Sequence, residues 1–74
     1  MKFVIEIRSD QPSGDDCLSR AIIDGNLGTA KAKASVLLEI WARYGANSVR
    51  ILAGNGDQLL DLSQAAAGIV ERAA

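Results

Sequence analysis

Histidine is missing from this 74-residue chain, and cysteine and each aromatic residue type occur only once. With Cys17 as the sole cysteine, no disulfide can form within the chain. One thiol with scattered carboxylates and no imidazole does not make a zinc or iron–sulfur site, so we expect no cofactor. Small domains often need a disulfide, a metal or a partner chain for stability, and a homodimer is therefore one hypothesis.

The chain also lacks an excess of one charge, because it has 8 basic and 9 acidic residues and an isoelectric point of about 5.1. Binders of DNA or RNA usually carry a basic excess or a basic stripe, so the balance disfavours nucleic acid as the main partner. No apolar run approaches the roughly 20 residues that span a membrane, and residues 1–6 alternate in polarity, unlike a signal peptide. We therefore expect a single domain over residues 1–74 in the reducing cytoplasm.

The N-terminal segment has the two-residue period of a β-strand, with Phe3, Ile5 and Ile7 at alternate positions. Residues 9–16 are rich in Ser, Asp, Pro and Gly, which predicts a loop. Residues 17–23 fit either a strand or a short helix capped by Ser13. The β-branched pair Ile22-Ile23 favours the strand.

Residues 27–44 predict a long helix, with Asn26 as its N-cap and Gly45 at the left-handed position that ends many helices. The predicted apolar stripe recurs at helical spacing and consists of Leu27, Ala30, Ala34, Leu37, Leu38, Trp41 and Tyr44. Such a stripe is expected to pack across one face of a sheet.

A β-hairpin is predicted from residues 49–53 and 58–62, which flank Gly54-Asn55-Gly56-Asp57. Asn-Gly favours a two-residue type I′ turn, in which both central residues have positive φ. That turn pairs Ile51 with Leu60 and Val49 with Leu62 on one face. It pairs Arg50 with Asp61 and Leu52 with Leu59 on the other.

The last segment, residues 64–74, is rich in alanine and predicts a short helix capped by Ser63. The fold class is then α+β, an antiparallel sheet of ββαββ order with one long helix across one face and a short C-terminal helix. The sheet side of the core is expected to consist of Phe3, Ile5, Ile7, Val49, Ile51, Leu60 and Leu62.

Catalytic chemistry is not indicated, and we predict that the chain is not an enzyme. A nucleophilic cysteine needs basic neighbours or a helix N-terminus, whereas Cys17 follows Asp15 and Asp16; a structural role fits better. Asp10 with these two aspartates lacks the spacing and the late glutamate of a calcium loop. The Gly54-Asn55-Gly56 segment lies between strands rather than before a helix, so it does not resemble a phosphate loop.

Two surfaces could contact a partner. On the long helix, Lys31, Lys33 and Arg43 could touch phosphates, but they also fit an ordinary solvated face. The back of the sheet is the stronger candidate, because an apolar centre framed by charges often marks a contact surface. The predicted centre consists of Val4, Leu52 and Leu59 with either Leu18 or Ile22. The predicted charged frame consists of Lys2, Glu6, Arg8, Arg50 and Asp61. The alternative is that the C-terminal helix or the 9–16 loop covers this face. The predicted partner-binding residues are Val4, Glu6, Arg50, Leu52, Leu59 and Asp61.

Residues 27–62 resemble small anti-CRISPR proteins of phages and mobile elements. The resemblance lies in the helix, which starts Leu27-Gly28-Thr29-Ala30-Lys31-Ala32-Lys33-Ala34 and leads to Trp41, and in the Asn-Gly hairpin that follows it. The resemblance is one of pattern and implies a non-enzymatic inhibitor that binds a CRISPR surveillance complex. The leading hypothesis is therefore a protein-binding module, with such an inhibitor as its specific form. A homo-oligomer that buries the back of the sheet and a weak nucleic-acid-contacting accessory protein are the alternatives.

Overall fold

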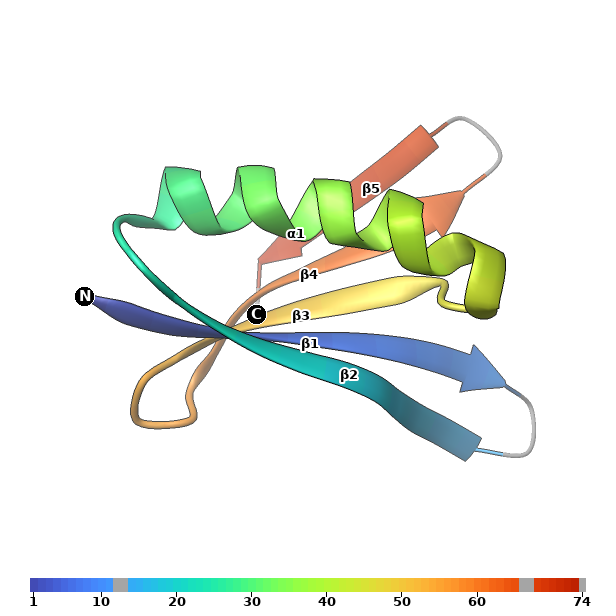
Figure 1. The fold of residues 1–74 in the computed structure, drawn as a ribbon, viewed down its shortest axis with the longest axis horizontal. Helices are drawn as coiled ribbons and strands as arrows, with labels where there is room; N and C mark the ends of the chain where they lie inside the picture. The colour runs from blue at the N-terminus through green and yellow to red at the C-terminus, as the bar shows by residue number, and fades with distance from the viewer. Residues whose placement is uncertain (12–13, 66–67, 74) are drawn as a thin grey trace.

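A computed structural model describes residues 1–11, 14–65 and 68–73. It shows an α+β fold in which one helix packs on a five-stranded antiparallel sheet of order β2-β1-β3-β4-β5 (Figure 1). The strands are β1 (Lys2–Gln11), β2 (Gly14–Asp24), β3 (Ser48–Ala53), β4 (Gln58–Ala65) and β5 (Gly68–Ala73). The helix α1 spans Leu27–Trp41 and continues as a short 3₁₀ turn, η1 (Ala42–Tyr44).

The predicted strand at residues 17–23 is confirmed as part of β2, but the predicted loop at 9–16 is wrong over most of its length. Residues 9–11 extend β1 and residues 14–16 extend β2, with Ser9 opposite Asp16 and Gln11 opposite Gly14. Pairing with a neighbouring strand outweighs the low strand propensity of Asp, Ser and Gly. Pro12 and Ser13 lie outside the described residues.

The predicted C-terminal helix is also wrong, because β4 continues to Ala65 and residues 68–73 form β5 along its outer edge. Gly68 has φ +122°, which is not a helical backbone. A short alanine-rich helix is marginal without packing, whereas the free edge of β4 offers a row of backbone hydrogen bonds. Ser63 therefore lies inside β4 opposite Val70, while residues 66–67 and 74 lie outside the described residues.

The helix begins as predicted at Asn26, whose side-chain oxygen accepts hydrogen bonds from the Thr29 backbone N–H at 2.8 Å and from its hydroxyl at 3.1 Å. Gly45 ends η1 with φ +93°. The apolar stripe is narrower than predicted, since Leu27 and Tyr44 are exposed. A 3₁₀ turn has three residues per turn, and this change of period over residues 42–44 takes Tyr44 off the stripe.

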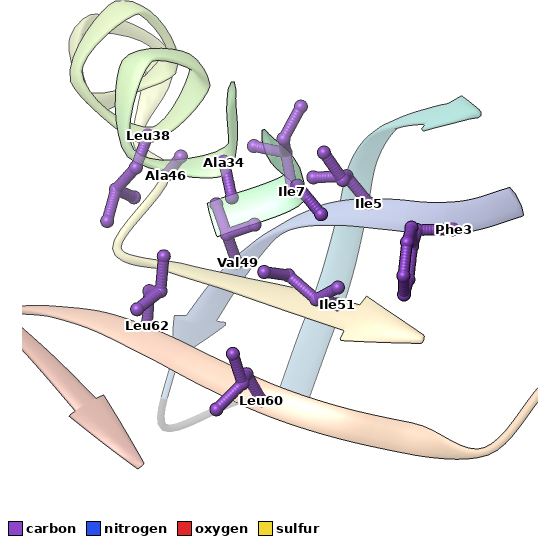
Figure 2. Close-up of a cluster of buried hydrophobic side chains, with 11 residues drawn as sticks. Phe3, Ile5, Ile7, Ala34, Leu38, Ala46, Val49, Ile51, Leu60 and Leu62 are labelled. Atoms are coloured by element: carbon purple, nitrogen blue, oxygen red, sulfur yellow. The ribbon is translucent and has the colours of Figure 1, made fainter. Parts of the chain in front are cut away.

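The core lies between α1 and the sheet, and all seven predicted sheet residues are buried there (Figure 2). The helix contributes Ala30, Ala34 and Leu38 as buried residues, with Leu37 and Trp41 partly buried beside them. Two of the three buried helix residues are alanines, so the helix backbone can approach the sheet closely.

The hairpin between β3 and β4 is confirmed, but its turn is not type I′. Gly56 has φ +97°, while no non-glycine residue in the described ranges has positive φ, so Asn55 is not left-handed. The Gly56 N–H donates to the Ala53 carbonyl at 2.9 Å and the Ala53 N–H to the Asp57 carbonyl at 2.8 Å. These bonds define a three-residue loop with a left-handed glycine at its end.

A β-bulge at Leu59 corrects the register that this longer loop would otherwise shift. The longer loop pairs Leu52 with Gln58, whereas the predicted partner of Leu52 was Leu59. Leu59 is the extra, unpaired residue of the bulge, and the next pair is Ile51 with Leu60. The predicted pairs of Ile51 with Leu60, Val49 with Leu62, and Arg50 with Asp61 are therefore correct. The side chain of Leu59 packs against the core cluster instead.

Replacing Gly56 with alanine should lower the free energy of unfolding by about 1–2 kcal/mol, because an L-residue is strained in the left-handed region. The matched control is Gly54→Ala in the same loop. Gly54 has no positive φ, and a Cβ there would lie 3.5 Å from the Lys2 carbonyl oxygen, an ordinary contact. Urea unfolding of both variants tests the turn, and equal losses would contradict the geometry described above.

Candidate functional site

The face of the sheet opposite α1, called the open face below, is formed by the side chains that alternate with the buried core residues. In β1, Phe3, Ile5 and Ile7 are buried under the helix, so the intervening side chains point the other way. Register pairing carries the same division into the other strands. The open face includes Lys2, Val4, Glu6, Arg8, Arg20, Ile22, Asp24, Arg50, Leu52, Asp61, Val70 and Arg72.

Five of the six residues predicted to bind a partner are on the open face: Val4, Glu6, Arg50, Leu52 and Asp61. Leu59 is not, because its bulge directs it to the core. The open choice between Leu18 and Ile22 is settled in favour of Ile22, which is 70% exposed and pairs with Val4. Leu18 lies at a second bulge, between Ser19 and Cys17, and packs against the core.

An apolar row crosses three adjacent strands of the open face, with Ile22 of β2 next to Val4 of β1 and Val4 next to Leu52 of β3. This row borders a shallow hollow of about 370 Å³. Glu6 and Arg20 line one side of the hollow, and Gly54 and Gly56 of the hairpin loop also line it. The hollow thus joins apolar surface, an ion pair and two glycines, which add no side chain to its lining.

Beside the apolar row runs a ladder of charges that alternate in sign across all five strands. Register pairing places its members side by side in the order Arg20, Glu6, Arg50, Asp61 and Arg72. Opposite charges on neighbouring strands attract each other at this spacing. The ladder therefore helps to hold the strands in register as well as giving the face its polarity.

Glu6 contacts two arginines, one on the neighbouring strand β2 and one on its own strand. Its Oε2 accepts a hydrogen bond from Arg20 Nη2 at 2.8 Å, and its Oε1 lies 3.6 Å from Arg8 Nη1. The side chains of Glu6 and Arg8 are only 13% and 15% exposed. Ion pairs at this degree of burial are less screened by water and salt than pairs at the surface.

The open face is cationic, although the whole chain has a net charge of −1. Register also places Lys2 and Asp24 on this face, where their charges cancel. Over the stretch of β1 from Lys2 to Arg8 and its partners in register, five positive charges thus stand against three negative charges, a local balance of +2. Of the chain's arginines, Arg43 alone lies elsewhere, after α1. The sheet thus collects a local charge that the overall composition conceals.

The basic residues predicted as a phosphate-contacting helix face do not extend this surface. Lys31 is bound to Glu71 at 2.6 Å, and Lys33 and Arg43 are exposed on the helix, on the other side of the sheet. Tyr44, predicted to be part of the apolar stripe, is 69% exposed and lies against Trp41 with ring centroids 5.4 Å apart. The cations of the molecule are thus divided between two faces.

The remaining candidates from the sequence form no site. Cys17 is exposed, not a buried structural residue, and its thiol donates to the Ser19 carbonyl at 3.5 Å. Asp10 is opposite Asp15 in the pairing of β1 with β2. Across residues 1–11, 14–65 and 68–73, no three His, Cys, Asp or Glu side chains group as metal ligands.

The predicted partner-binding set lacked four residues of the open face: Arg8, Arg20, Ile22 and Arg72. Of these, Arg8 was predicted in the charged frame, and Ile22 was one alternative for the apolar centre. Ile22 and Arg20 needed the register of β2, which the bulge at Leu18 made ambiguous from periodicity alone. Arg72 was missed because its segment was assigned to a helix. The available signal was the alternation of Val70 and Arg72 with Ile69 and Glu71, which is too short to separate a strand from a helix.

Comparison of the chain with protein-family models, curated proteins and solved structures finds no match. Within the part of the chain that the structure describes, no helix has the length and apolar character needed to cross a bilayer.

Replacing Glu6 with glutamine should destabilise the protein by about 1–3 kcal/mol, because the largely buried Arg8 and the neighbouring Arg20 each lose an anionic partner. The matched control is Glu71→Gln, which removes the same charge from the exposed pair with Lys31 and should cost at most about 1 kcal/mol. Thermal or urea unfolding of both variants gives the comparison. A loss for Glu71→Gln as large as that for Glu6→Gln would show that burial does not strengthen the ladder.

Proposed function

We propose that this chain is a non-enzymatic, cytoplasmic protein-binding module whose open face docks on an acidic surface of a protein complex. The observation that carries the proposal is the apolar row of Ile22, Val4 and Leu52 lying directly beside the charge ladder. Apolar surface with a charged border is typical of protein interfaces. The shape of the hollow, the charge of the open face and the pairing of Glu6 with Arg20 indicate the kind of partner.

The hollow favours a protruding side chain over a small molecule. Pockets for small ligands bury most of the ligand surface, whereas this hollow is shallow and one of its walls, Ile22, is 70% exposed. An aliphatic or aromatic side chain of a partner could contact Ile22, Val4 and Leu52 together. Burial of such an anchor is a common source of binding energy.

The charge of the face favours an acidic partner. The local balance of +2 around the ladder would attract carboxylates of an approaching protein and speed association at low salt. Arg72, at the end of the ladder, is exposed. Arginine forms bidentate hydrogen bonds with carboxylates, which gives the docking a preferred orientation.

The polar groups of the hollow suit docking better than catalysis. Glu6 is bound to Arg20 at 2.8 Å, so its carboxylate is engaged as a salt-bridge partner. A general base has to reach the proton that it removes. Docking needs only that the charges be held in place, which the ladder achieves.

We further propose that the acidic partner belongs to a CRISPR surveillance complex, so that the chain acts as an inhibitor. The support is the resemblance of residues 27–62 to small anti-CRISPR proteins, together with a surface suited to protein contact. Two copies packed open face to open face would bring two cationic surfaces together. This repulsion disfavours the alternative of a homo-oligomer that buries the back of the sheet.

Ile22→Ser should weaken binding to the partner by roughly tenfold, because an exposed aliphatic anchor buried on binding is worth about 1.5 kcal/mol or more. The control is Ile69→Ser, the same substitution at a 37%-exposed residue of β5 on the helix side of the sheet. The partner is first captured on the wild-type protein, purified and titrated by calorimetry. Equal affinities for wild type and Ile22→Ser would refute docking at the open face, and loss of capture after nuclease treatment would indicate nucleic acid instead.

Expression of the wild-type chain should restore plating of a targeted phage on at least one strain of a panel that carries different CRISPR systems. Ile22→Ser should lose most of this protection, while Ile69→Ser retains it. The efficiency of plating measures both effects, with immunoblots to show equal protein levels. Unchanged interference in every strain of the panel would contradict the inhibitor role and leave the docking surface to be judged by the titration above.

A further inference from the structure

The outer side of β5 is a free edge of the sheet, because β5 is last in the strand order and pairs only with β4 in the described chain (Figure 1). Such an edge presents a row of unpaired backbone N–H and C=O groups to which another strand can be added. Residues 69–73 are all exposed, and β5 pairs with β4 without a bulge. The other edge strand, β2, has a bulge at Leu18, which hinders further pairing. The edge of β5 is therefore the better suited of the two to accept a strand.

The backbone groups that face this free edge belong to Ile69, Glu71 and Ala73. The Gln64 N–H donates to the Asn47 carbonyl at 2.8 Å, so the backbone groups of Gln64 face the side of β3. In an antiparallel ladder, two opposite residues point their backbone groups either toward each other or away from each other. Gln64 is opposite Ile69, so the N–H and C=O of Ile69 point away from β4. Alternation along the strand gives Glu71 and Ala73 the same direction.

Arg72 is the last member of the charge ladder and has no neighbour on its outer side. Its side chain is exposed and forms no ion pair or hydrogen bond among residues 1–11, 14–65 and 68–73. Because the backbone groups of Arg72 face β4, an added strand would oppose it in a non-hydrogen-bonded pair, in which side chains come closest. The alternating signs of the ladder then favour an acidic side chain at this position.

We propose that the free edge of β5 binds an extended strand of the partner protein by main-chain pairing, with an acidic residue opposite Arg72. The strand runs antiparallel to β5, as the strand pairs of this sheet do. Val70 is 43% exposed on the same face as Arg72, and it is opposite the residue two positions after the acidic one, where an apolar side chain fits. The inference rests on the proposed function, because the strand belongs to the acidic partner, and it names the segment that this partner contributes.

A second copy of this chain does not supply the acidic residue. When β5 pairs with β5 of another copy about a two-fold axis, opposite residues lie on the same face of the sheet, so even-numbered residues are opposite even-numbered residues. Arg72 would then be opposite Gly68, Val70 or the second copy's Arg72, and none of these is acidic. Adding the second copy's β2 at the level of the ladder would set Arg72 against Arg20. The edge is thus complementary to the strand of a different protein.

The first test uses a capped synthetic peptide, Thr-Glu-Thr-Val-Thr-Thr, in which the glutamate and the valine take the places opposite Arg72 and Val70. The control peptide has lysine in place of the glutamate. In an NMR titration the amide signals of residues 68–73 should shift, and the control should bind roughly tenfold more weakly, because attraction to Arg72 becomes repulsion. Arg72→Glu should reverse this preference. Wild-type protein without shifts in residues 68–73 at millimolar peptide, or with equal affinity for both peptides, overturns the proposal.

A backbone variant tests the main-chain pairing separately from the charge. Glu71→Pro removes an N–H that points to the free edge and leaves the hydrogen bonds with β4 in place. The matched comparison is Glu71→Gln, which also loses the ion pair with Lys31 but keeps the N–H. The glutamate peptide should bind Glu71→Gln at least roughly tenfold more tightly than Glu71→Pro, since the proline also obstructs the added strand. Equal binding by the two variants would exclude pairing along this edge.

Titration of the captured partner distinguishes failure of this inference from failure of the proposed function. Arg72→Glu and Glu71→Pro should each weaken partner binding by roughly tenfold. A loss in Ile22→Ser alone would keep docking at the open face and overturn strand addition. Losses in the two β5 variants, with the wild-type affinity retained in Ile22→Ser, would support the strand at β5 and refute docking on the apolar row.

Discussion

The strict alternation of side chains in the central strand β1 is the constraint on which the rest of the structure depends. Phe3, Ile5 and Ile7 point toward α1 and are nearly fully buried, which leaves Val4 and Glu6 on the other face. Because β1 pairs with both β2 and β3, its alternation sets the faces of its two neighbours. A slip of one residue would exchange core and surface on three strands together.

The same constraint explains how a nearly neutral chain has a cationic face. One charged residue from each strand falls at the same register position on the side without a helix, and antiparallel pairing arranges these five as a ladder of alternating sign. Glu71 is on the helix side instead, where it pairs with Lys31. Glu6 then has arginines on both neighbouring strands and Arg8 on its own strand. The ladder places opposite charges on neighbouring strands, where they attract each other, and it also forms the charged border of the apolar row.

The molecule divides its unburied apolar side chains between two surfaces with different chemistry. The row of Ile22, Val4 and Leu52 lies in a cationic surrounding, which favours a partner unlike itself. The outer side of α1 exposes Val36 and Ile40 between charged residues of both signs, Lys33 and Glu39. A thin core with a single helix on one face of the sheet leaves both surfaces available, because no second layer of structure covers either of them in the described chain.

The sequence by itself determined the elements in which local and long-range preferences agree. Spacing and turn chemistry predicted the period of β1, the N-cap of α1 at Asn26, the end of the helical segment at Gly45 and the hairpin at Asn55-Gly56. They also predicted all seven sheet residues of the core. Their physical basis lies within a few residues of chain or in the burial of one face. The three central pairs of the hairpin were predicted correctly for an additional reason, since the longer turn and the bulge at Leu59 shift the register in opposite directions.

Only the tertiary structure decided the features that depend on what a neighbouring strand offers. The bulges at Leu18 and Leu59 reverse which side chain reaches the core, and a single extra residue leaves no trace in an apolar pattern. Residues 68–73 became a strand because the edge of β4 was free to pair with them, although their composition suits a short helix. Leu59 therefore left the candidate surface and Arg72 joined it, since the hydrogen bonds of the sheet, rather than local propensity, assign both residues their faces.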